Sequence, residues 1–530
     1  MNRRNLLKAG TTALLAPWKL LASSNFDGRN STETLEAFPW GVASGDPSST
    51  GVILWTKLSP ELVPLGDDLD FVVSRDKNFQ DIVLSGSIDN QDISEENDFT
   101  VRVDLDGQLA SHQQYFYRFV FGDNASMVGR CRTLPDSNYD LDQLSLAIVN
   151  CQDYRNGFYH AYEAISQDNS IDFVLHLGDF IYEKTETDMD HNSFLRDLTL
   201  PSGKGLAQDL EDYRSLYKTY LSDPQLMKAR AQFTWMTIWD DHESINNAYW
   251  DYGNDTMAST DEGFAGKEGL KSLKLASQKA WFENIPARVE INPDSQHPHD
   301  YLSIYRSFAF GTLLNLSLSD TRTYRTKPSD SDSFQGSMLG ESQKEWLLEQ
   351  LQDDSFTWNV WGNQTLFSEN SIKWKDHVLT RPNKDSWDGY AEERLDLIDR
   401  LSHRDQRNLV VLTGDYHATI AGDIKTEDDR LLGYEFLSPA ISSASMLNLM
   451  KSKFDRLGPI PISKALLSVV KACNPNLKFV DPEQHGFGKV VFTKSLVHFA
   501  AFHVNKDLPY WDGEITKIWE RVESNTAHKV

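Results

Sequence analysis

The feature that most constrains the fold is a short apolar run that ends abruptly in a glycine and an aspartate. Residues Phe173–Leu177 are apolar apart from one histidine, and Gly178 and Asp179 follow directly. This pattern indicates a parallel strand that is buried on both faces. Open α/β sheets bind ligands beyond the carboxyl ends of such strands. We therefore expect this strand to carry Asp179 to a sheet edge, with Tyr182 three residues further along the same rim.

Similar runs recur through the second part of the chain, and helical segments separate several of them. A helix is expected at Ser342–Leu351, directly before one run, and another at Leu210–Tyr220 within a polar insertion. Strands that alternate with helices pair in parallel, so this part is expected to be an α/β domain. A final hairpin is expected at Val490–Phe492 and Val497–His503. The expected strands are Leu144–Asn150, Phe173–Leu177, Phe233–Trp239, Leu313–Leu318, Trp358–Trp361 and Leu409–Thr413.

The stretch before this part has the short runs of an antiparallel β domain. Clusters of Gly, Asp, Pro and Asn separate the runs, as in the turns of a β-sandwich. About a hundred residues of this kind are typical of an immunoglobulin-like or fibronectin-like sandwich. We assign residues 37–134 to this domain and residues 143–530 to the α/β domain with a C-terminal extension. The expected sandwich strands are Gly51–Thr56, Asp70–Ser74, Phe99–Asp104 and Tyr115–Phe121.

The N-terminus has the layout of an export signal. Arg3 and Arg4 precede the weakly apolar run Ala9–Ala16, and small residues follow at Ala22–Ser24. Paired arginines in this arrangement resemble a twin-arginine signal, and the run is too short to anchor the chain in a membrane. We expect residues 1–24 to be a signal peptide read by the twin-arginine export machinery. The protein would then be periplasmic or extracellular.

The composition excludes several classes of partner. The formal net charge of -26 argues against nucleic acid, because a phosphate backbone selects basic surfaces. No stretch after the N-terminus is long and apolar enough for an integral membrane segment. The three cysteines, Cys131, Cys151 and Cys473, are too few and too widely spaced for a disulfide framework.

Side chains suited to metal ions follow several of the expected strands. Carboxylates, imidazoles and a thiolate gathered at one sheet edge are what a two-metal hydrolytic site requires. A single such motif is better explained by a strand cap or a helix N-cap, but several together favour a metal centre. The candidate residues are Cys151, Asp179, Tyr182, Asp241, His242, Asp415 and His417.

The residue types indicate different metals and roles. Asp179 has two oxygens and can bridge two cations, and a cation would favour the thiolate form of Cys151. A phenolate at Tyr182 selects a highly charged ion such as Fe³⁺ over Zn²⁺. Gln364, at the end of the fifth strand, offers an amide oxygen that suits ions like Ca²⁺.

His242 is the expected proton donor, with Asp240 or Glu243 orienting its ring. In extended geometry the side chains of Asp415 and His417 would share one face and point at the cluster together.

Three of these motifs resemble those of the calcineurin-like, purple-acid-phosphatase-like metallophosphoesterases. They are Gly178–Tyr182, Trp239–Glu243 and Gly414–His417. Further motifs narrow the resemblance to the PhoD-like alkaline phosphatases, from about residue 37 to the C-terminus. They are Phe38–Pro47, Leu54–Thr56, Cys151–Tyr154, Asp320–Arg325 and Met338–Gln343.

This resemblance implies a four-layer α/β/β/α catalytic sandwich behind an N-terminal β-sandwich. It also implies a secreted phosphatase in which a metal-bound hydroxide attacks the phosphate ester, with His242 and Asp179 as catalytic residues. The implied cofactors are Fe³⁺ and Ca²⁺, with Zn²⁺, Mn²⁺ or Mg²⁺ as alternatives at one position. Carried over by motif, the iron ligands are Cys151, Asp179, Tyr182 and His417. The ligands of the second cation are Asp179, Asp241 and Asp415, with Gln364 as a further candidate.

Two departures from the family pattern leave the substrate contacts open. A phosphate-binding arginine is expected shortly after the tyrosine, but residues 183–188 contain three acidic residues and no arginine. Lys184 and Arg196 are the candidate substitutes, and Asn247 is a third candidate substrate contact. The segment Met446–Asn474 is longer than the family pattern leads us to expect.

The expected substrates are small phosphate esters, and two other functions remain open. One is a phosphodiesterase or phospholipase D-like enzyme that acts on nucleotide or phospholipid diesters. The other is a secreted binding protein without catalytic activity, which the complete set of candidate ligands disfavours. A zinc protease is disfavoured because the sequence has no His-Glu-x-x-His motif.

Overall fold

A computed structural model describes residues 18–20, 32–185, 194–264, 266–329, 336–374, 377–403, 407–454 and 462–525. Most of the expected signal peptide lies outside these residues. Its described part, β1 (Trp18–Leu20), pairs antiparallel with β6 (Ile82–Ile88). No helix in the described ranges is long and apolar enough to cross a membrane.

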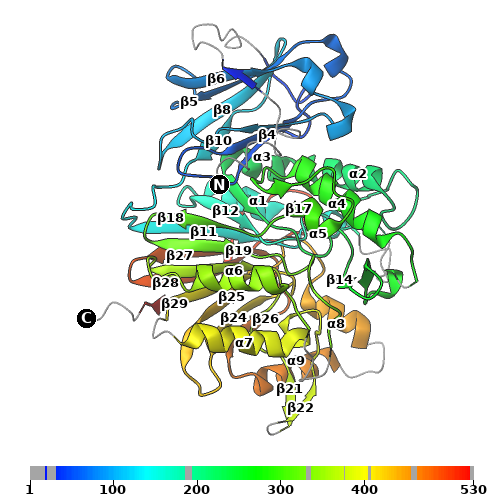
Figure 1. The fold of residues 1–530 in the computed structure, drawn as a ribbon, viewed down its shortest axis with the longest axis vertical. Helices are drawn as coiled ribbons and strands as arrows, with labels where there is room; N and C mark the ends of the chain where they lie inside the picture. Colours follow the sequence, from blue (N-terminus) through cyan, green and yellow to red (C-terminus); the bar gives the residue numbers. More distant parts are fainter. Residues whose placement is uncertain are drawn as a thin grey trace, which may run out of the picture.

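A nine-stranded sheet crosses the middle of the molecule in the order β29-β28-β27-β11-β12-β13-β3-β4-β7 (Figure 1). Strands β11, β12 and β13 pair in parallel as expected, and the C-terminal hairpin of β27 and β28 pairs antiparallel as expected. The strands are β3 (Val42–Gly45), β4 (Ile53–Lys57), β7 (Thr100–Asp104), β11 (Gln143–Val149), β12 (Phe173–His176), β13 (Thr234–Thr237), β27 (Gly486–Thr493), β28 (Leu496–His503) and β29 (Thr516–Ser524).

A second, seven-stranded sheet has the order β18-β19-β20-β23-β25-β24-β26. Strands β19, β20, β23 and β25 are parallel to one another, whereas β18, β24 and β26 pair antiparallel at the two sides of this group. The six strands expected from the apolar runs are therefore divided equally between two sheets. The strands are β18 (Arg306–Phe310), β19 (Leu314–Leu318), β20 (Trp358–Asn363), β23 (Leu409–Thr413), β24 (Thr419–Lys425), β25 (Leu431–Leu437) and β26 (Leu477–Asp481).

The two sheets pack face to face through one hydrophobic core. Their central strands are buried on both faces, which explains why these strands read as continuous apolar runs. Helices α1 (His160–Gln167) and α3 (Pro224–Gln232) contact the nine-stranded sheet. Helix α6 (Glu341–Leu351) contacts the other sheet, and α7 (Ala391–Ser402) packs beside it. Residues that meet between the sheets include Phe173 with Phe310, Trp358 with Phe492 and Phe436 with Phe499.

The N-terminal β domain shares a sheet with the α/β domain. Its separate sheet has the order β1-β6-β5-β8-β9-β2, with β10 paired to β8. This sheet packs on β4 and β7, so a two-layer sandwich is present. One layer of this sandwich continues into the α/β domain, because β3 pairs in parallel with β13 and joins the nine-stranded sheet. The remaining strands are β2 (Thr32–Glu33), β5 (Leu69–Ser74), β8 (Gln114–Phe121), β9 (Asn124–Ala125) and β10 (Gly129–Arg132).

Helix α2 (Leu210–Leu221) matches the helix expected in the polar insertion. Asp209 caps it by accepting a hydrogen bond from the amide of Asp212. Tyr213, Tyr217 and Tyr220 follow at helical spacing and are all buried. The capped helix therefore holds a stripe of tyrosines against the core, and α4 (Leu270–Asn284) packs beside it.

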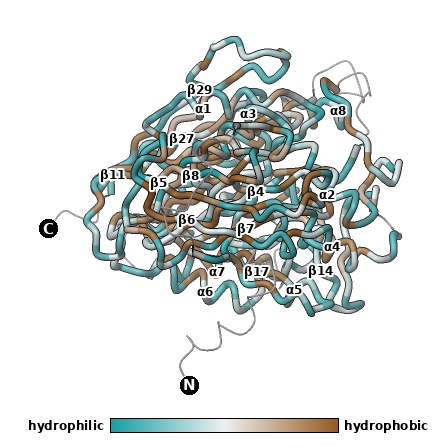
Figure 2. The backbone as a smooth tube through the Cα atoms, turned by 90° about the horizontal axis from the view of Figure 1, so that it is seen from above, coloured by the Kyte–Doolittle hydropathy of each residue, from teal (hydrophilic) through white to brown (hydrophobic). Residues whose placement is uncertain are grey.

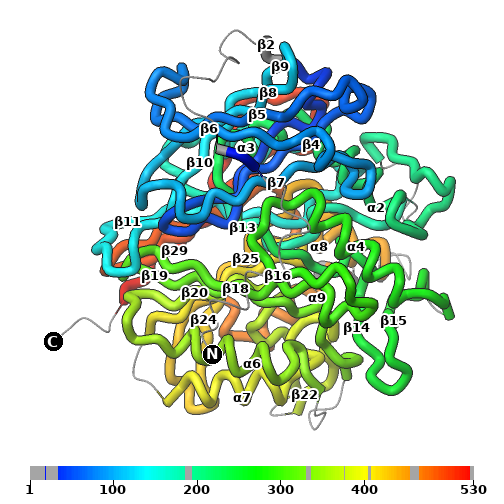
Figure 3. The backbone as a smooth tube through the Cα atoms, turned by 45° about the horizontal axis from the view of Figure 1, so that its top comes forward, coloured from blue at the N-terminus to red at the C-terminus, as the bar shows by residue number. Residues whose placement is uncertain are grey.

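At the end remote from the N-terminal β domain lie α8 (Met446–Phe454), α9 (Ile462–Cys473) and the hairpin β21 (Ile372–Trp374) and β22 (His377–Thr380) (Figures 1 and 3). Seen from above, hydrophobic segments run through the interior strands, whereas much of the periphery is hydrophilic (Figure 2). The smaller elements are α5 (Pro298–Tyr301), β14 (Ala248–Asp251), β15 (Thr256–Ser259), β16 (Glu290–Ile291) and β17 (Leu302–Ser303).

Candidate metal centre

The loops that follow the central strands turn through left-handed backbone. Cys151, Asp179, Asp415 and His417 have φ angles of 53°, 57°, 66° and 51°. Such angles cost non-glycine residues about 1–3 kcal/mol each and are concentrated at functional sites. Gly178, at φ 103°, is required for close packing, since an added Cβ would lie 2.4 Å from the Cβ of Asp240. The strand ends are thus bent sharply so that their side chains converge.

One group of converging ligand atoms comes from Cys151, Asp179 and His417, all within 4.8 Å of one another. The hydroxyl of Tyr182 joins them, at 2.9 Å from Asp179 Oδ2 and 3.2 Å from His417 Nε2. His417 Nδ1 lies 2.6 Å from the carbonyl oxygen of Ala444, which directs Nε2 toward the cluster. A thiol, a carboxylate, a phenol and an imidazole therefore meet at one point.

Two further groups continue the cluster without a break. Asp179, Asp241 and His242 form one, and Asp240, Asp241 and Asp415 form the other. Asp179 belongs to the first two groups and Asp241 to the last two. Asp241 Oδ1 is buried without a hydrogen-bond partner in the described part of the chain. An orphaned carboxylate oxygen in this position is suited to a cation.

The buried acidic groups of the cluster also favour bound cations. Burial raises the pKa of the Cys151 thiol and of Asp240 well above their usual ranges, and raises the pKa of Asp415 to about 7. Buried anionic groups need nearby positive charge to stay ionised. Bound cations would lower these pKa values and keep the thiolate and carboxylates available as ligands.

Arg322 supplies positive charge from within the cluster. Its guanidinium pairs with Asp240 and Asp385, and lies 3.3 Å from Asp415 Oδ1 and 3.7 Å from Asp241 Oδ2. Although burial opposes it, Arg322 is the main influence that lowers the pKa of Asp241. Arg322 thus holds in place the carboxylates of the ligand group Asp240, Asp241 and Asp415. The motif Asp320–Arg325 did not reveal this role in the sequence.

The extended geometry expected for residues 415–417 is wrong. Strand β23 ends at Thr413, and Asp415 and His417 both adopt positive φ. Both side chains nevertheless face the cluster. Tyr416 points away, and its hydroxyl accepts a hydrogen bond from Asn370 Nδ2 at 3.3 Å. Two left-handed residues, not the alternation of a strand, produce this arrangement.

The acid that orients His242 is Glu183, not Asp240 or Glu243. Nδ1 of His242 lies 2.7 Å from Glu183 Oε2, and Glu183 is fully buried. Asp240 is engaged by Arg322, and Glu243 accepts hydrogen bonds from backbone amides, including that of Asp179. Burial alone would lower the pKa of His242, but Glu183, Asp179 and Asp241 outweigh it and raise that pKa well above 6.5. These carboxylates therefore favour the protonated form of the ring.

Gln364 does not lie among the ligand groups. Its Nε2 donates to the carbonyl oxygens of Trp239 and Ser319, and its Oε1 accepts from the amide of Thr321. The side chain therefore joins the ends of β20 and β19 and has no free oxygen directed at a cation. Asn247 contributes its backbone amide, which donates to Asp241 Oδ2 at 2.8 Å.

A cavity of about 830 Å³ opens beside the cluster. Tyr182, His242 and His417 line it where it meets the ligand groups. Basic side chains line it as well, although the chain as a whole is strongly acidic. They are Arg155, Lys184, Lys204 and Lys267.

Comparisons with known proteins agree with this geometry. The family model of the PhoD-like phosphatases matches residues 146–501, and the model of the PhoD-like phosphatase N-terminal domain matches residues 22–135. The chain belongs to the PhoD-like phosphatase family.

Two relatives support this assignment along most of the chain. It is 32% identical over 446 residues to alkaline phosphatase D of Bacillus subtilis (strain 168), covering 78% of this chain and 71% of the relative. A solved structure of PhoD superposes with a TM-score of 0.78 at 27% identity, covering 92% of this chain and 91% of the other. As a family member, the chain is a phosphoric ester hydrolase.

Of the two basic residues that we expected to bind phosphate, only Lys184 lines the cavity. Lys184 pairs with Asp261. Arg196 is not among the lining residues, since its guanidinium binds Asp223 Oδ2 at 2.6 Å and lies on the ring of Tyr154. Its position therefore does not support the expected contact with substrate.

Arg155 is a better candidate that the sequence analysis missed. It lines the cavity, is buried, and has Nε and Nη1 without hydrogen-bond partners among the described residues. Nη2 lies 3.4 Å from Asp153 Oδ2, and each of the two unpaired donors can make a charge-assisted hydrogen bond with a phosphate oxygen. Arg155 directly follows the motif Cys151–Tyr154, so the chain does place an arginine near the metal centre, but after the first strand instead of the second.

We expect Arg155→Met to lower kcat/KM for phosphate esters by about 10- to 100-fold, since charge-assisted hydrogen bonds contribute about 1.5–3 kcal/mol. Steady-state kinetics with p-nitrophenyl phosphate, and inhibition by inorganic phosphate, measure the loss. Arg196→Met is the matched control and should keep KM within about twofold. If Arg196→Met lowered kcat/KM strongly and Arg155→Met did not, Arg196 would be the residue that binds phosphate.

Proposed function

We propose that this protein is a metal-dependent phosphatase that hydrolyses small phosphate monoesters in the cavity beside Tyr182 and His242. The observation that carries the proposal is the shared position of Asp179, which belongs to two groups of ligand atoms directly beside a cavity that basic side chains help to line. Shared carboxylates are the means by which two cations are held next to each other for hydrolysis.

The donor set supports different ions at the two positions. Cys151, Asp179, Tyr182 and His417 would hold Fe³⁺, since thiolate and phenolate suit a highly charged ion. Asp179, Asp241 and Asp415 would hold Ca²⁺, with Zn²⁺, Mn²⁺ or Mg²⁺ as alternatives at one position. When bound, these ions neutralise phosphate oxygens and acidify a water molecule.

The side chains of this protein then perform the remaining tasks. Arg155 binds oxygens of the phosphate and orients the phosphorus toward the water. The bond from phosphorus to the water oxygen forms as the bond to the leaving oxygen breaks. His242 donates its proton to that leaving oxygen, so that an alcohol departs. Glu183, 2.7 Å from Nδ1, fixes the ring and stabilises its protonated form.

A phosphodiesterase is the second candidate, and the size of the cavity favours it. About 830 Å³ exceeds what a phosphate group alone needs, so a second substituent could be accommodated. Comparing kcat/KM for p-nitrophenyl phosphate and bis(p-nitrophenyl) phosphate distinguishes the two activities. A preference for the monoester supports the main proposal.

We also propose export by the twin-arginine machinery, which would place the protein in the periplasm or outside the cell. The support is the sequence of residues 1–24 alone. Export in a folded state would allow the metal centre to be loaded before translocation.

We expect protein purified without chelators to contain iron and to absorb visible light, because phenolate or thiolate bound to Fe³⁺ is coloured. Elemental analysis and a visible spectrum measure both properties. A strong chelator should abolish hydrolysis of p-nitrophenyl phosphate, and addition of Fe³⁺ with Ca²⁺ should restore it. A colourless, iron-free protein that retains full activity would contradict the proposed metals.

A further inference from the structure

The segment Met446–Asn474 differs in charge from the rest of the chain. It contains five basic residues and one acidic residue, a formal charge of +4, whereas the whole chain carries -26. Lys451 and Lys471 lie on α8 and α9 and have no carboxylate partner in the described part of the structure. Among the side chains that the structure describes, α8 and α9 therefore carry lysines and no acidic residue. The charged residues are Lys451, Lys453, Asp455, Arg456, Lys464 and Lys471.

Large apolar side chains are exposed in the same region. Trp374 is 68% exposed and Leu379 64%, both on the β21–β22 hairpin, and Val469 on α9 is 44% exposed. The hairpin contacts α9, and α9 contacts α8, so these elements form one surface at the end remote from the N-terminal β domain (Figures 1 and 3). We call these three elements the distal surface. Exposed tryptophan and aliphatic residues beside lysines are typical of proteins that insert into the headgroup layer of a membrane.

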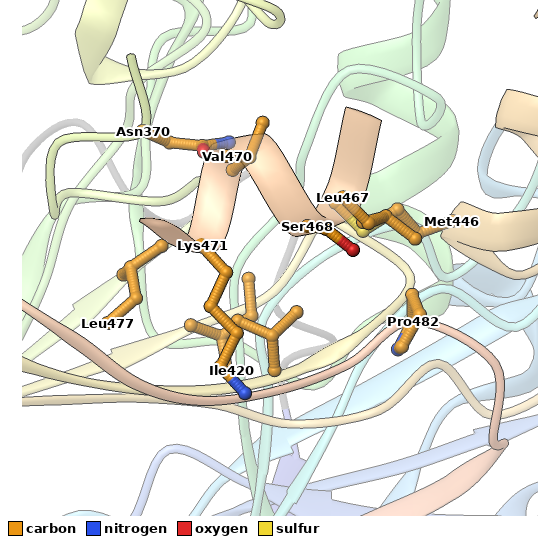
Figure 4. Close-up of a pocket in the computed structure, with 10 residues that line it drawn as sticks. Asn370, Ile420, Met446, Leu467, Ser468, Val470, Lys471, Leu477 and Pro482 are labelled. Atoms are coloured by element: carbon orange, nitrogen blue, oxygen red, sulfur yellow. The ribbon is translucent and has the colours of Figure 1, made fainter. Parts of the chain in front are cut away.

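Helix α9 is not tightly packed on the sheet beneath it. A cavity of about 140 Å³ lies between α9 and strands β24 and β26 (Figure 4). Leu467 and Val470 of α9 line it, together with Ile420 and Leu477, and the exposed Lys471 lies at its rim. The apolar residues of α9 are therefore divided between this cavity and solvent, which leaves part of the helix available to an apolar partner.

The distal surface is connected to the active site by α8. Leu449 and Ser452 of this helix line the large cavity beside the metal centre. Lys451 and Lys453 belong to the same helix. A flat partner that contacts the lysines of α8 would therefore lie close to the mouth of the catalytic cavity.

We propose that the distal surface binds the surface of an anionic lipid bilayer. Basic side chains provide the attraction to acidic headgroups, and Trp374 and Val469 enter the headgroup layer. The net charge of the remaining chain repels such a membrane, so binding occurs through this end alone. This inference goes beyond the proposed function, because adsorption does not require hydrolysis.

Co-sedimentation of the full chain with vesicles tests the proposal. We expect binding to vesicles of phosphatidylglycerol and phosphatidylcholine in equal amounts, and at least about tenfold weaker binding to phosphatidylcholine alone. High salt should weaken binding to the anionic vesicles, because ions screen the lysines. Two double variants, Trp374→Ser with Val469→Ser and Lys451→Gln with Lys471→Gln, should each lower the partition coefficient by more than about tenfold.

Matched controls lie away from the distal surface. Leu65→Ser with Val522→Ser removes exposed apolar side chains elsewhere, and Lys77→Gln with Lys517→Gln removes charge elsewhere. These variants should bind vesicles like the parent protein. All variants should hydrolyse soluble p-nitrophenyl phosphate at the parent rate, which shows that they are folded. Absence of binding to anionic vesicles, or equal loss in the control variants, would overturn the proposal, as would self-association through Trp374 in the absence of lipid.

Discussion

Asp179→Asn is expected to lower the rate of phosphate-ester hydrolysis by at least about a thousandfold and to remove bound metal. The reason is the position of this carboxylate between two groups of ligand atoms, with Cys151 and His417 on one side and Asp241 on the other. An amide has one oxygen and no charge, so it cannot join two cations. Because the metal centre supplies both charge neutralisation and the nucleophile, its loss removes the chemistry instead of slowing one step.

Two measurements check this expectation. Elemental analysis should show that both metals are lost together, and kinetics with p-nitrophenyl phosphate should show activity near background even when metal salts are added. The matched control is Asp142→Asn, an exposed aspartate that pairs with Lys494 at the surface. It should retain full metal content and activity. If Asp179→Asn retained near-normal turnover, the two ligand groups would not act as one centre.

The sequence predicted the strands and most residues of the candidate centre for one physical reason. Strands buried on both faces must be apolar, so the polar residues that follow them stand out clearly. Asp179 after β12 and Asp415 after β23 are examples. The apolar pattern cannot show which strands share a sheet, however, because it depends on burial and not on which strands are hydrogen-bonded to each other. The family resemblance implied two sheets, but the assignment of each strand to its sheet, and the pairing of β3 with β13, appeared only in the structure.

Residues that act through tertiary contacts could not be identified from the sequence either. Glu183 lies 59 positions from His242, and nothing in its own surroundings distinguishes it from other acidic residues nearby. Asp240 and Glu243 flank His242 in sequence, but the ring points toward Glu183. Arg322 likewise reaches its carboxylates from a loop after β19. Sequence proximity therefore identified the ligands at strand ends but not the groups that hold them in place.

The positive φ angles explain a second limit. Asp415 and His417 both face the cluster, yet the backbone between them is not extended. A residue pair at i and i+2 converges equally well in a strand or in two left-handed turns, so the correct side-chain directions were predicted from the wrong backbone. Gly178 is the clearer signal in retrospect, because its place before Asp179 marks the tight approach to Asp240.

Replacement of His242 by asparagine is the second large effect that we expect, and its size should depend on the leaving group. General acid catalysis contributes about 10²–10⁴-fold when the departing oxygen needs a proton. An alkyl phosphate releases a strongly basic alkoxide, so His242→Asn should slow its hydrolysis by at least about a hundredfold. p-Nitrophenolate is a weak base and departs unprotonated, so its phosphate should lose much less. Kinetics with both substrates measure the ratio, and equal losses would contradict the role of His242 as proton donor.

The pH dependence provides an independent test through Glu183. Burial works to lower the pKa of His242, but Glu183 and the neighbouring aspartates outweigh it and hold the pKa well above 6.5. The protonated ring, the active form of the acid, is present below that pKa and is lost as the pH rises through it. Glu183→Gln removes the main raising influence, so the alkaline limb of the pH profile for an alkyl phosphate should move to lower pH. Glu349→Gln, on the exposed side of α6, should leave the profile unchanged, and an unmoved limb in Glu183→Gln would show that this carboxylate does not control the proton of His242.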